Sequence, residues 1–198
     1  MKNRLFAFGS LLGLFLVSVA FTNPPAIYKA DTAKSIVTWK GYKVTGSHEG
    51  TIDLQNGELV YENGTLKGGS FTIDMASIAC TDLSGGMKGK LEGHLKSADF
   101  FGVDKYPTAK FEVTKVVSRG TPGEYKVIGN LTIKETTKEI KFMTTIDESA
   151  TAPIAKADIT IDRSDFDVRY GSGSFFDNLG DKTIYDEFEL SIELVVNK

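Results

Sequence analysis

The chain has 198 residues with a formal net charge of −3 at pH 7, and 41% of the residues are apolar and 25% charged. A mixed, mildly acidic surface without a block of basic residues argues against nucleic acid, and against electrostatic docking on anionic lipid. The single cysteine, Cys80, excludes an internal disulfide and zinc sites built from several thiolates. We expect Cys80 to be a small buried side chain, with an intermolecular disulfide or a reactive thiol as the alternatives.

The first twenty residues are predicted to be a signal peptide that is cleaved off. Lys2 and Arg4 precede a largely apolar run that ends in small residues at Ala20, which is the pattern a signal peptidase reads. A membrane anchor is the alternative, because the run approaches the length that spans a bilayer. The signal peptide is favoured because no basic stop-transfer cluster follows the run. We therefore expect residues 21–198 to form a single domain that is periplasmic or secreted.

From Ser35 onward, much of the chain alternates between apolar and polar residues at period two. The last strand is the clearest case, with one apolar and one polar face. Its apolar face consists of Phe188, Leu190, Ile192, Leu194 and Val196. Residues 140–146 and 155–162 follow the same pattern. One apolar and one polar face is typical of antiparallel sheets, so we predict an all-β protein.

Tight turns are predicted between these strands. Asn56-Gly57 and Asn63-Gly64 each lie beside an alternating run, and Asn-Gly is a strong hairpin signal. Residues 121–124 contain a Pro-Gly pair and predict another turn. About eight strands joined in this way form a meander that either closes into a barrel or stacks as a sandwich. An antiparallel up-and-down barrel is favoured, because closure removes the exposed edges of the sheet.

One short amphipathic helix interrupts the strands. Met87, Leu91 and Leu95 recur every fourth residue, which places them on one helical face. Glycines in and before the helix weaken it, so packing must hold it in place, and we expect Phe100 and Phe101 to fasten it. We predict that the segment Leu91–Phe101 covers one end of the barrel and opens for a ligand. A static plug that completes the core is the alternative.

Three motifs stand out along the chain: residues 91–113 (LEGHLKSADFFGVDKYPTAKFEV), residues 129–140 (GNLTIKETTKEI) and residues 161–176 (IDRSDFDVRYGSGSFF). Together, and in this order, they resemble the YceI-like family of secreted, lipocalin-like β-barrels that bind polyisoprenoids. Two residues depart from the family pattern. Gly102 stands where members usually have an acidic residue, and Asp167 stands where a glycine usually follows Asp-Phe. Both lie in predicted turns, so they affect local backbone shape.

No arrangement of residues predicts catalysis, a cofactor or a metal centre. His48 and His94 are the only histidines, and they lie in different elements without the spacing of metal ligands. The run at residues 171–174, GSGS, lacks the lysine and the following helix of a phosphate-binding loop. Pairs of aspartates occur in predicted turns, where such residues ordinarily cap the turn. We therefore predict a protein that is not an enzyme.

The residues alone leave open whether the barrel is hollow or filled by its own side chains. The resemblance implies a hollow, elongated interior that holds a long-chain isoprenoid or a related amphiphilic lipid. The predicted ligand-binding residues are Trp39, Phe71, Ile73, Leu91, His94, Leu95, Phe100, Phe111, Leu131, Phe142, Ile159, Arg163, Phe188 and Leu190. Arg163, His94 and Lys96 are the cations that we expect near an opening, where a lipid head group would lie.

Two functions therefore compete. The first is a non-enzymatic lipid-binding or transport protein, either monomeric or homodimeric, with a hollow barrel. The second is a small-molecule enzyme or stress-response protein with a filled barrel and a polar surface site formed by Asp99, Arg163 and Asp165. A continuous apolar tunnel would favour the first function, whereas a filled barrel with a polar cleft near Asp99 and Asp165 would favour the second.

Overall fold

The computed structural model describes residues 24–147, 149 and 152–197. The predicted signal peptide, residues 1–20, lies outside the described residues. The elements are β1 (Ala26–Ala30), β2 (Ile36–Lys43), β3 (Gly46–Glu62), β4 (Thr65–Cys80), α1 (Gly85–Lys96), β5 (Thr108–Ser118), β6 (Glu124–Ile133), β7 (Thr136–Asp147), β8 (Ile154–Asp162), η1 (Arg163–Phe166), η2 (Gly180–Lys182) and β9 (Ile184–Asn197).

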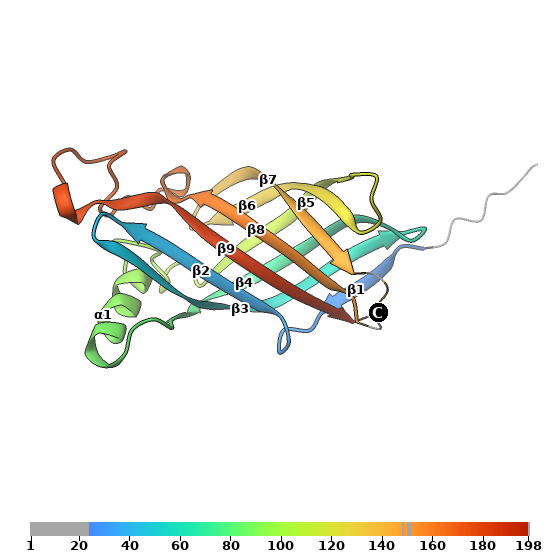
Figure 1. Ribbon diagram of the computed structural model, residues 1–198, viewed down its shortest axis with the longest axis horizontal. Coiled ribbons are helices and arrows are strands. Elements are labelled where there is room, and N and C mark those ends of the chain that lie inside the picture. Colours follow the sequence, from blue (N-terminus) through green and yellow to red (C-terminus); the bar gives the residue numbers. More distant parts are fainter. Residues whose placement is uncertain (1–23, 148, 150–151, 198) are drawn as a thin grey trace, which may run out of the picture.

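The strands form one antiparallel sheet that closes on itself (Figure 1). From β2 to β9, each strand pairs with the next one along the chain, and β9 returns to pair with β2. β1 and β2 occupy a single position in the barrel, because both pair with β3 and β9. The result is an up-and-down barrel with eight strand positions, which we call staves, and it confirms the predicted fold class.

The interruption between β1 and β2 is bridged by the side chain of Ser35. Its hydroxyl donates a hydrogen bond to the carbonyl of Asp31 at 2.8 Å and accepts one from the amide of Val195 at 3.1 Å. The amide of Asp31 donates to the carbonyl of Val195 at 2.8 Å. Backbone groups that would otherwise lack partners are therefore satisfied, and the wall stays closed at this point.

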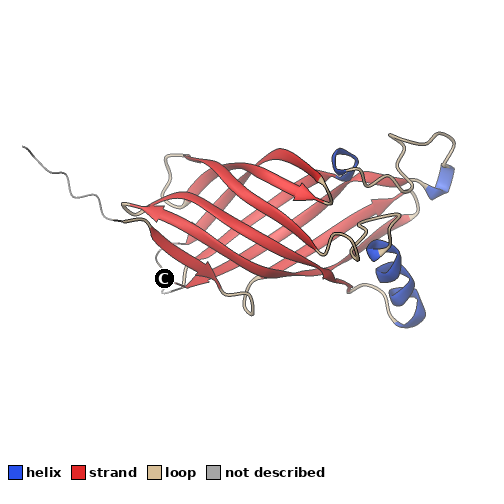
Figure 2. Ribbon diagram, turned by 180° about the vertical axis from the view of Figure 1, so that it is seen from behind, coloured by secondary structure: helices blue, strands red, loops and turns tan. Residues whose placement is uncertain are grey.

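The two ends of the barrel differ. The helical elements α1, η1 and η2 all lie toward one end, on the left of Figure 1 and on the right of Figure 2, which we call the helix end. The turns after β3, β5 and β7 and the end of β9 lie at the opposite end, which we call the termini end. Figure 2 shows that no described helix covers the outer side of the barrel wall. The described helical elements are therefore confined to one end of the barrel.

One of the two predicted Asn-Gly hairpins is present and the other is not. Asn63 and Gly64 join β3 to β4 with positive φ angles of 51° and 74°, as a tight hairpin requires. Asn56 and Gly57 instead lie inside β3, next to an irregularity in its pairing with β4 after Leu54. The prediction of a turn there was wrong because the same dipeptide also suits a bulge, and β3 continues to Glu62.

The helix α1 is present, and it packs less deeply than its spacing suggests. None of its residues is buried, and Met87 in its first turn is strongly exposed although it shares a face with Leu91 and Leu95. The first turn therefore lies outside the packed interface. The aromatic pair after the helix contacts it, because the buried ring of Phe100 lies 5.6 Å from that of His94 in α1 and 5.0 Å from that of Phe101, as centroid distances.

The termini end is filled by side chains. Tyr61, Tyr125 and Val196 are buried there, and the ring of Tyr28 stacks on that of Tyr61 with centroids 4.9 Å apart. These residues come from β1, β3, β6 and β9, so several staves contribute to the filling. They close the interior at the termini end, which leaves the helix end as the other end of the cavity.

Candidate functional site

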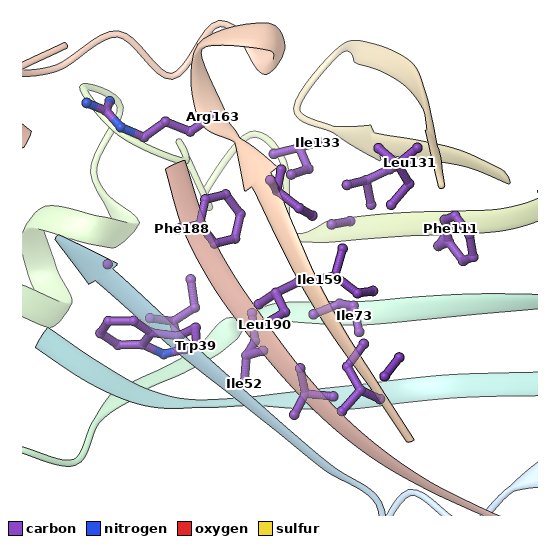
Figure 3. Close-up of a pocket in the computed structure, with 18 of the residues that line it drawn as sticks. Trp39, Ile52, Ile73, Phe111, Leu131, Ile133, Ile159, Arg163, Phe188 and Leu190 are labelled. Atoms are coloured by element: carbon purple, nitrogen blue, oxygen red, sulfur yellow. The ribbon is translucent and has the colours of Figure 1, made fainter. Parts of the chain in front are cut away.

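A cavity of about 650 Å³ lies inside the barrel (Figure 3). All eight staves line it, together with α1 and the loop between η1 and β9. The volume falls within the range of roughly 300–1,000 Å³ that is typical of small-molecule sites. All fourteen residues predicted to bind a ligand lie on the cavity wall, so the structure brings them together around one space. Their contact with a ligand remains a prediction.

The middle of the cavity wall is apolar. Figure 3 shows aliphatic side chains gathered around β8 and β9, among them Ile52, Ile159 and Leu190. Thr144, one of the polar side chains on the wall, already has a partner, because its hydroxyl donates to the carbonyl of Lys156 at 2.8 Å. This part of the wall can therefore bury apolar groups, but it directs no hydrogen bond at a ligand.

Three of the large aromatic rings lie over glycines of the cavity wall. An added Cβ at Gly50 would stand 2.6 Å from Trp39 Cζ2, and one at Gly129 would stand 2.5 Å from Phe111 Cζ. Because each ring covers a position without a side chain, it lies along the wall instead of crossing the lumen. The third pair consists of Gly57 and Phe71, which face each other across β3 and β4.

These ring–glycine pairs explain how a barrel with so many inward-facing aromatic residues remains hollow. Phe111 also contacts Phe142 at a centroid distance of 5.5 Å, so neighbouring rings support each other along the wall. The structure thus resolves the alternative that the sequence left open, in favour of a hollow interior.

Arg163 lies at the helix end of the cavity, but its donors are used within the protein. Arg163 is 2% exposed, and its guanidinium donates to the carbonyls of Val168, Ile184 and Tyr185 at 2.7, 2.9 and 3.1 Å. Its Nη2 also lies 3.2 Å from Asp186 Oδ1. Burial lowers the pKa of Arg163, and the nearby carboxylates oppose this shift. Arg163 therefore fastens the loop before β9 to the barrel, and it has little capacity left for a lipid head group.

The two other predicted cations differ from Arg163. His94 lies on the cavity wall, with its ring centroid 4.4 Å from that of Tyr170 and 5.6 Å from that of Phe100. Its Nε2 atom is buried without a hydrogen-bond partner among the described residues. His94 thus connects α1 to the loop that carries Tyr170 through ring packing. Lys96 does not line the cavity.

The polar surface site of the competing enzyme hypothesis does not assemble. Asp99 and Asp165 are both exposed, and Asp165 Oδ1 lies 3.6 Å from the ammonium group of Lys138. The guanidinium of Arg163 pairs with Asp186 instead of with either of them. Asp165 and Arg163 therefore have separate partners, and no contact joins the three residues into a common site.

A polar cluster beside the helix end was missed by sequence reasoning. The thiol of Cys80, which is fully buried as predicted, donates to Asp82 Oδ1 at 3.0 Å. Asp82 Oδ2 lies 2.9 Å from His48 Nδ1, and Asp82 Oδ1 accepts a hydrogen bond from the amide of Glu49. No spacing in the sequence indicates this cluster, because pairing between β3 and β4 brings His48 and Asp82 together.

The electrostatics of this cluster oppose nucleophilic chemistry. Hydrogen bonds from the Cys80 thiol and from His48 lower the pKa of Asp82 to about 2, and the bond from the thiol has the larger effect. Burial and the adjacent carboxylate raise the pKa of Cys80. A carboxylate stands between the thiol and the imidazole, so His48 is not placed to remove the thiol proton. The cluster ties β3 to the segment before α1, and the amide of Cys80 also donates to Glu92 in that helix at 2.8 Å.

Other chemistries lack a site in the described part of the chain. Within residues 24–147, 149 and 152–197, no three side chains of the types that ligate metals gather. In the same residues, no helix has the length and apolar character needed to cross a membrane.

A closed eight-stave barrel around an apolar cavity is a lipocalin-like fold. Residues 28–196 match the YceI-like domain, and the chain belongs to this family. A UPF0312 protein of Vibrio cholerae is 30% identical over 143 residues, which cover 71% of each chain.

Solved structures agree with this assignment. The chain is similar to BcnA of Burkholderia cenocepacia, with a TM-score of 0.69, 25% identity and coverage of 84% of this chain and 98% of that one. A polyisoprenoid binding domain from Saccharophagus degradans, implicated in plant cell wall breakdown, superposes with a TM-score of 0.61. It is 15% identical, with coverage of 86% of this chain and 97% of the other, and it supports the fold.

Proposed function

We propose that this protein binds and transports a long-chain isoprenoid or a similar amphiphilic lipid, without catalysing a reaction. The observation that carries the proposal is the hollow barrel, whose cavity of about 650 Å³ has an apolar middle and a closed termini end. Membership of the YceI-like family supports it, as does the similar fold of a polyisoprenoid binding domain from Saccharophagus degradans.

Burial alone can supply the affinity for such a ligand. Each isoprene unit has five carbons, and burying a methylene-sized group contributes about 0.8 kcal/mol. A few units inside the cavity therefore offset the loss of translational and rotational freedom on binding, without a directed hydrogen bond. A largely apolar wall suits a ligand whose only polar group lies at one end.

The place of action is a further part of the proposal. If residues 1–20 are a cleaved signal peptide, the mature protein is periplasmic or secreted and begins near Phe21. Mass spectrometry of the protein recovered from the secreting host tests this point. A full-length chain that remains in the membrane fraction would show an anchor instead.

Trp39 provides a direct test of binding, because it is the only tryptophan of the chain and lines the cavity. We expect isoprenoid alcohols, isoprenoid quinones and prenyl phosphates of increasing length to change its fluorescence with increasing affinity. A short, water-soluble alcohol serves as the control. If no apolar chain of any kind alters Trp39 fluorescence or co-purifies with the protein, the proposed function is wrong.

A further inference from the structure

The exposed apolar side chains of the described residues are concentrated at the helix end. Six of them, which we call the collar, are Val44, Met87, Tyr170, Phe175, Phe176 and Tyr185, and their exposed fractions range from 41% to 62%. They come from the turn after β2, from α1, from the loop between η1 and η2 and from the start of β9. Only Ile27, Ile36 and Met143 are comparably exposed elsewhere in the part of the chain that the structure describes.

The collar segments are neighbours in space as well as in their place at one end of the barrel. The amide of Val44 donates to the carbonyl of Thr183, two residues before Tyr185, at 3.1 Å. The ring of Tyr170 lies against that of His94 in α1. In Figure 1, α1 and the loop before η2 lie on opposite sides of the left end, with the turn after β2 between them. The collar thus surrounds the end of the barrel.

The cavity reaches solvent at the collar. Tyr170 and Tyr185 both line the cavity, although 47% and 51% of their surfaces are exposed. The exposed residues Lys43 and Lys182 lie on the same part of the wall. The opposite end is filled by Tyr61, Tyr125 and Val196. A ligand that follows the cavity therefore enters and leaves through the collar.

We propose that the collar docks on the surface of a lipid bilayer, so that a ligand passes between the membrane and the cavity without crossing water. The proposal rests on the function proposed above. A patch of exposed apolar side chains indicates an interaction surface, and tyrosine and phenylalanine are suited to the interface of a bilayer. The position of the cavity mouth within this patch favours a bilayer, because a long isoprenoid is itself held in membranes.

The charges around the collar predict how this docking depends on lipid composition. Basic side chains such as Lys88 and Lys182 alternate with acidic ones such as Asp177 and Asp181, so neither sign dominates. The main contribution is then burial of apolar area, not attraction to anionic head groups. Binding should be similar on phosphatidylcholine vesicles and on vesicles that also contain phosphatidylglycerol, and it should change little with salt.

The test compares two double variants of the full mature chain. The collar variant is Met87→Ser with Phe176→Ser, and neither residue lines the cavity. The matched control is Ile27→Ser with Met143→Ser, whose residues are 54% and 49% exposed on the barrel wall. In sedimentation with phosphatidylcholine vesicles, we expect the wild type and the control to bind equally. The collar variant should bind about tenfold more weakly, since it loses two apolar side chains.

A second measurement separates this proposal from the proposed function. An isoprenoid alcohol added from dilute detergent should load the wild type and both variants equally, as read by Trp39 fluorescence. If none of them loads, the proposed function fails. If all load, but vesicle binding is absent or the same in all three, the docking proposal fails while the carrier function stands. Sedimentation velocity tests one more alternative. If the wild type is a dimer and the collar variant is a monomer, the collar binds a second copy of the chain, and the docking proposal is overturned.

Discussion

The ring of Phe71 lies over Gly57 on the neighbouring strand, so that an added Cβ at residue 57 would come within 3.0 Å of Phe71 Cε1 and closer still to Cδ1. The two residues lie on the β3–β4 pair, inside the barrel. Because the glycine has no side chain, the ring occupies the wall and leaves the lumen open. The same relationship between Trp39 and Gly50 indicates that the hollow interior is built into the pairing of the strands.

Replacing Gly57 with alanine should narrow the cavity without unfolding the barrel. The nearest atoms to the new Cβ belong to the Phe71 ring, which can turn into the lumen, and no backbone atom blocks the substitution. We expect affinity for a long isoprenoid to fall about tenfold, because the narrower cavity would bury roughly two fewer methylene-sized groups of the ligand. Titration followed by Trp39 fluorescence measures this loss, and urea unfolding checks stability.

Two other glycines serve as controls for this substitution. A Cβ at Gly173, which does not line the cavity, would meet nothing within 4 Å, so Gly173→Ala should bind as the wild type does. A Cβ at Gly129 would stand 2.5 Å from the carbonyl oxygen of Glu112, so Gly129→Ala should destabilise the fold itself. Equal binding by Gly57→Ala and Gly173→Ala would contradict the role given to the ring–glycine pair.

A charge placed inside the barrel should prevent lipid binding, whereas the same charge on the next residue should not. Phe142 lines the cavity, and Met143 is exposed on the outer face of the same strand. Burying an unpaired carboxylate against an apolar ligand costs several kcal/mol. We expect Phe142→Asp to lose isoprenoid uptake and Met143→Asp to keep it. Normal uptake by Phe142→Asp would show that the inside and outside faces have been assigned incorrectly.

Substitution of Arg163 should reduce stability more than it reduces specificity for a head group. Arg163→Leu removes hydrogen bonds to three carbonyls and leaves the largely buried Asp186 without its cation. Loss of one partner of a buried ion pair costs about 3–5 kcal/mol. Arg163→Lys should restore only part of this, because an ammonium group cannot reproduce the fork of contacts. Guanidinium unfolding measures both variants. A stable Arg163→Leu protein that rejects only charged lipids would instead indicate a head-group site.

The cluster at Asp82 predicts a loss of stability in acid. The pKa of Asp82 is about 2 in the folded protein, below its ordinary value of 3.8. A carboxyl group whose pKa is lower in the folded protein than in the unfolded chain stabilises the fold at pH values above its pKa in the unfolded chain. This contribution is lost as the pH falls through the pKa of the folded protein. Because Asp82 is partly exposed, the contribution is on the order of 1 kcal/mol.

Comparison with Asp82→Asn isolates this contribution. The difference in unfolding free energy between the wild type and Asp82→Asn should be constant above about pH 5 and should shrink between about pH 4 and pH 2. Urea unfolding across this range measures the difference. A difference that stays constant down to the lowest pH would contradict the assigned linkage.

The prediction that α1 is an opening cover can be tested by hydrogen exchange. No residue of α1 is buried, and Gly89 and Gly93 weaken the helix. Local opening should therefore be frequent in the empty protein and rarer once a ligand packs against Leu91 and Leu95. We expect amides of residues 88–101 to exchange more slowly in the lipid-loaded form. Equal and strong protection in both forms would establish a static plug.

The sequence predicted the barrel well because its main signal is local. Alternation in β7, β8 and β9 reports which side chains face inward, and Ile159 and Leu190 lie on the cavity wall as expected. The helix and the pair Phe100–Phe101 were also found, since spacing and aromatic content are visible along the chain. Met87 was placed on the right face, but its exposure depends on where the barrel ends.

Features that depend on register or on loops could not be predicted. Asn56-Gly57 has the composition of a hairpin, and only its pairing with β4 shows that it continues a strand. The partners of Arg163 are carbonyls at residues 168, 184 and 185, which a side-chain pattern does not reveal. The loop between η1 and η2 has no periodicity, so its part in the collar was missed. The hollow interior depends on which glycine faces which ring.

Native mass spectrometry of the protein purified from its secreting host, with parallel solvent extraction, tests the central claim most directly. The account predicts a bound species that adds the mass of a long isoprenoid-type chain, is released by extraction and can be replaced by an added isoprenoid. The Phe142→Asp variant, prepared in parallel, should lack the bound species. A wild-type protein that carries no apolar chain and accepts none when isoprenoid alcohols, quinones and prenyl phosphates are offered would contradict the account.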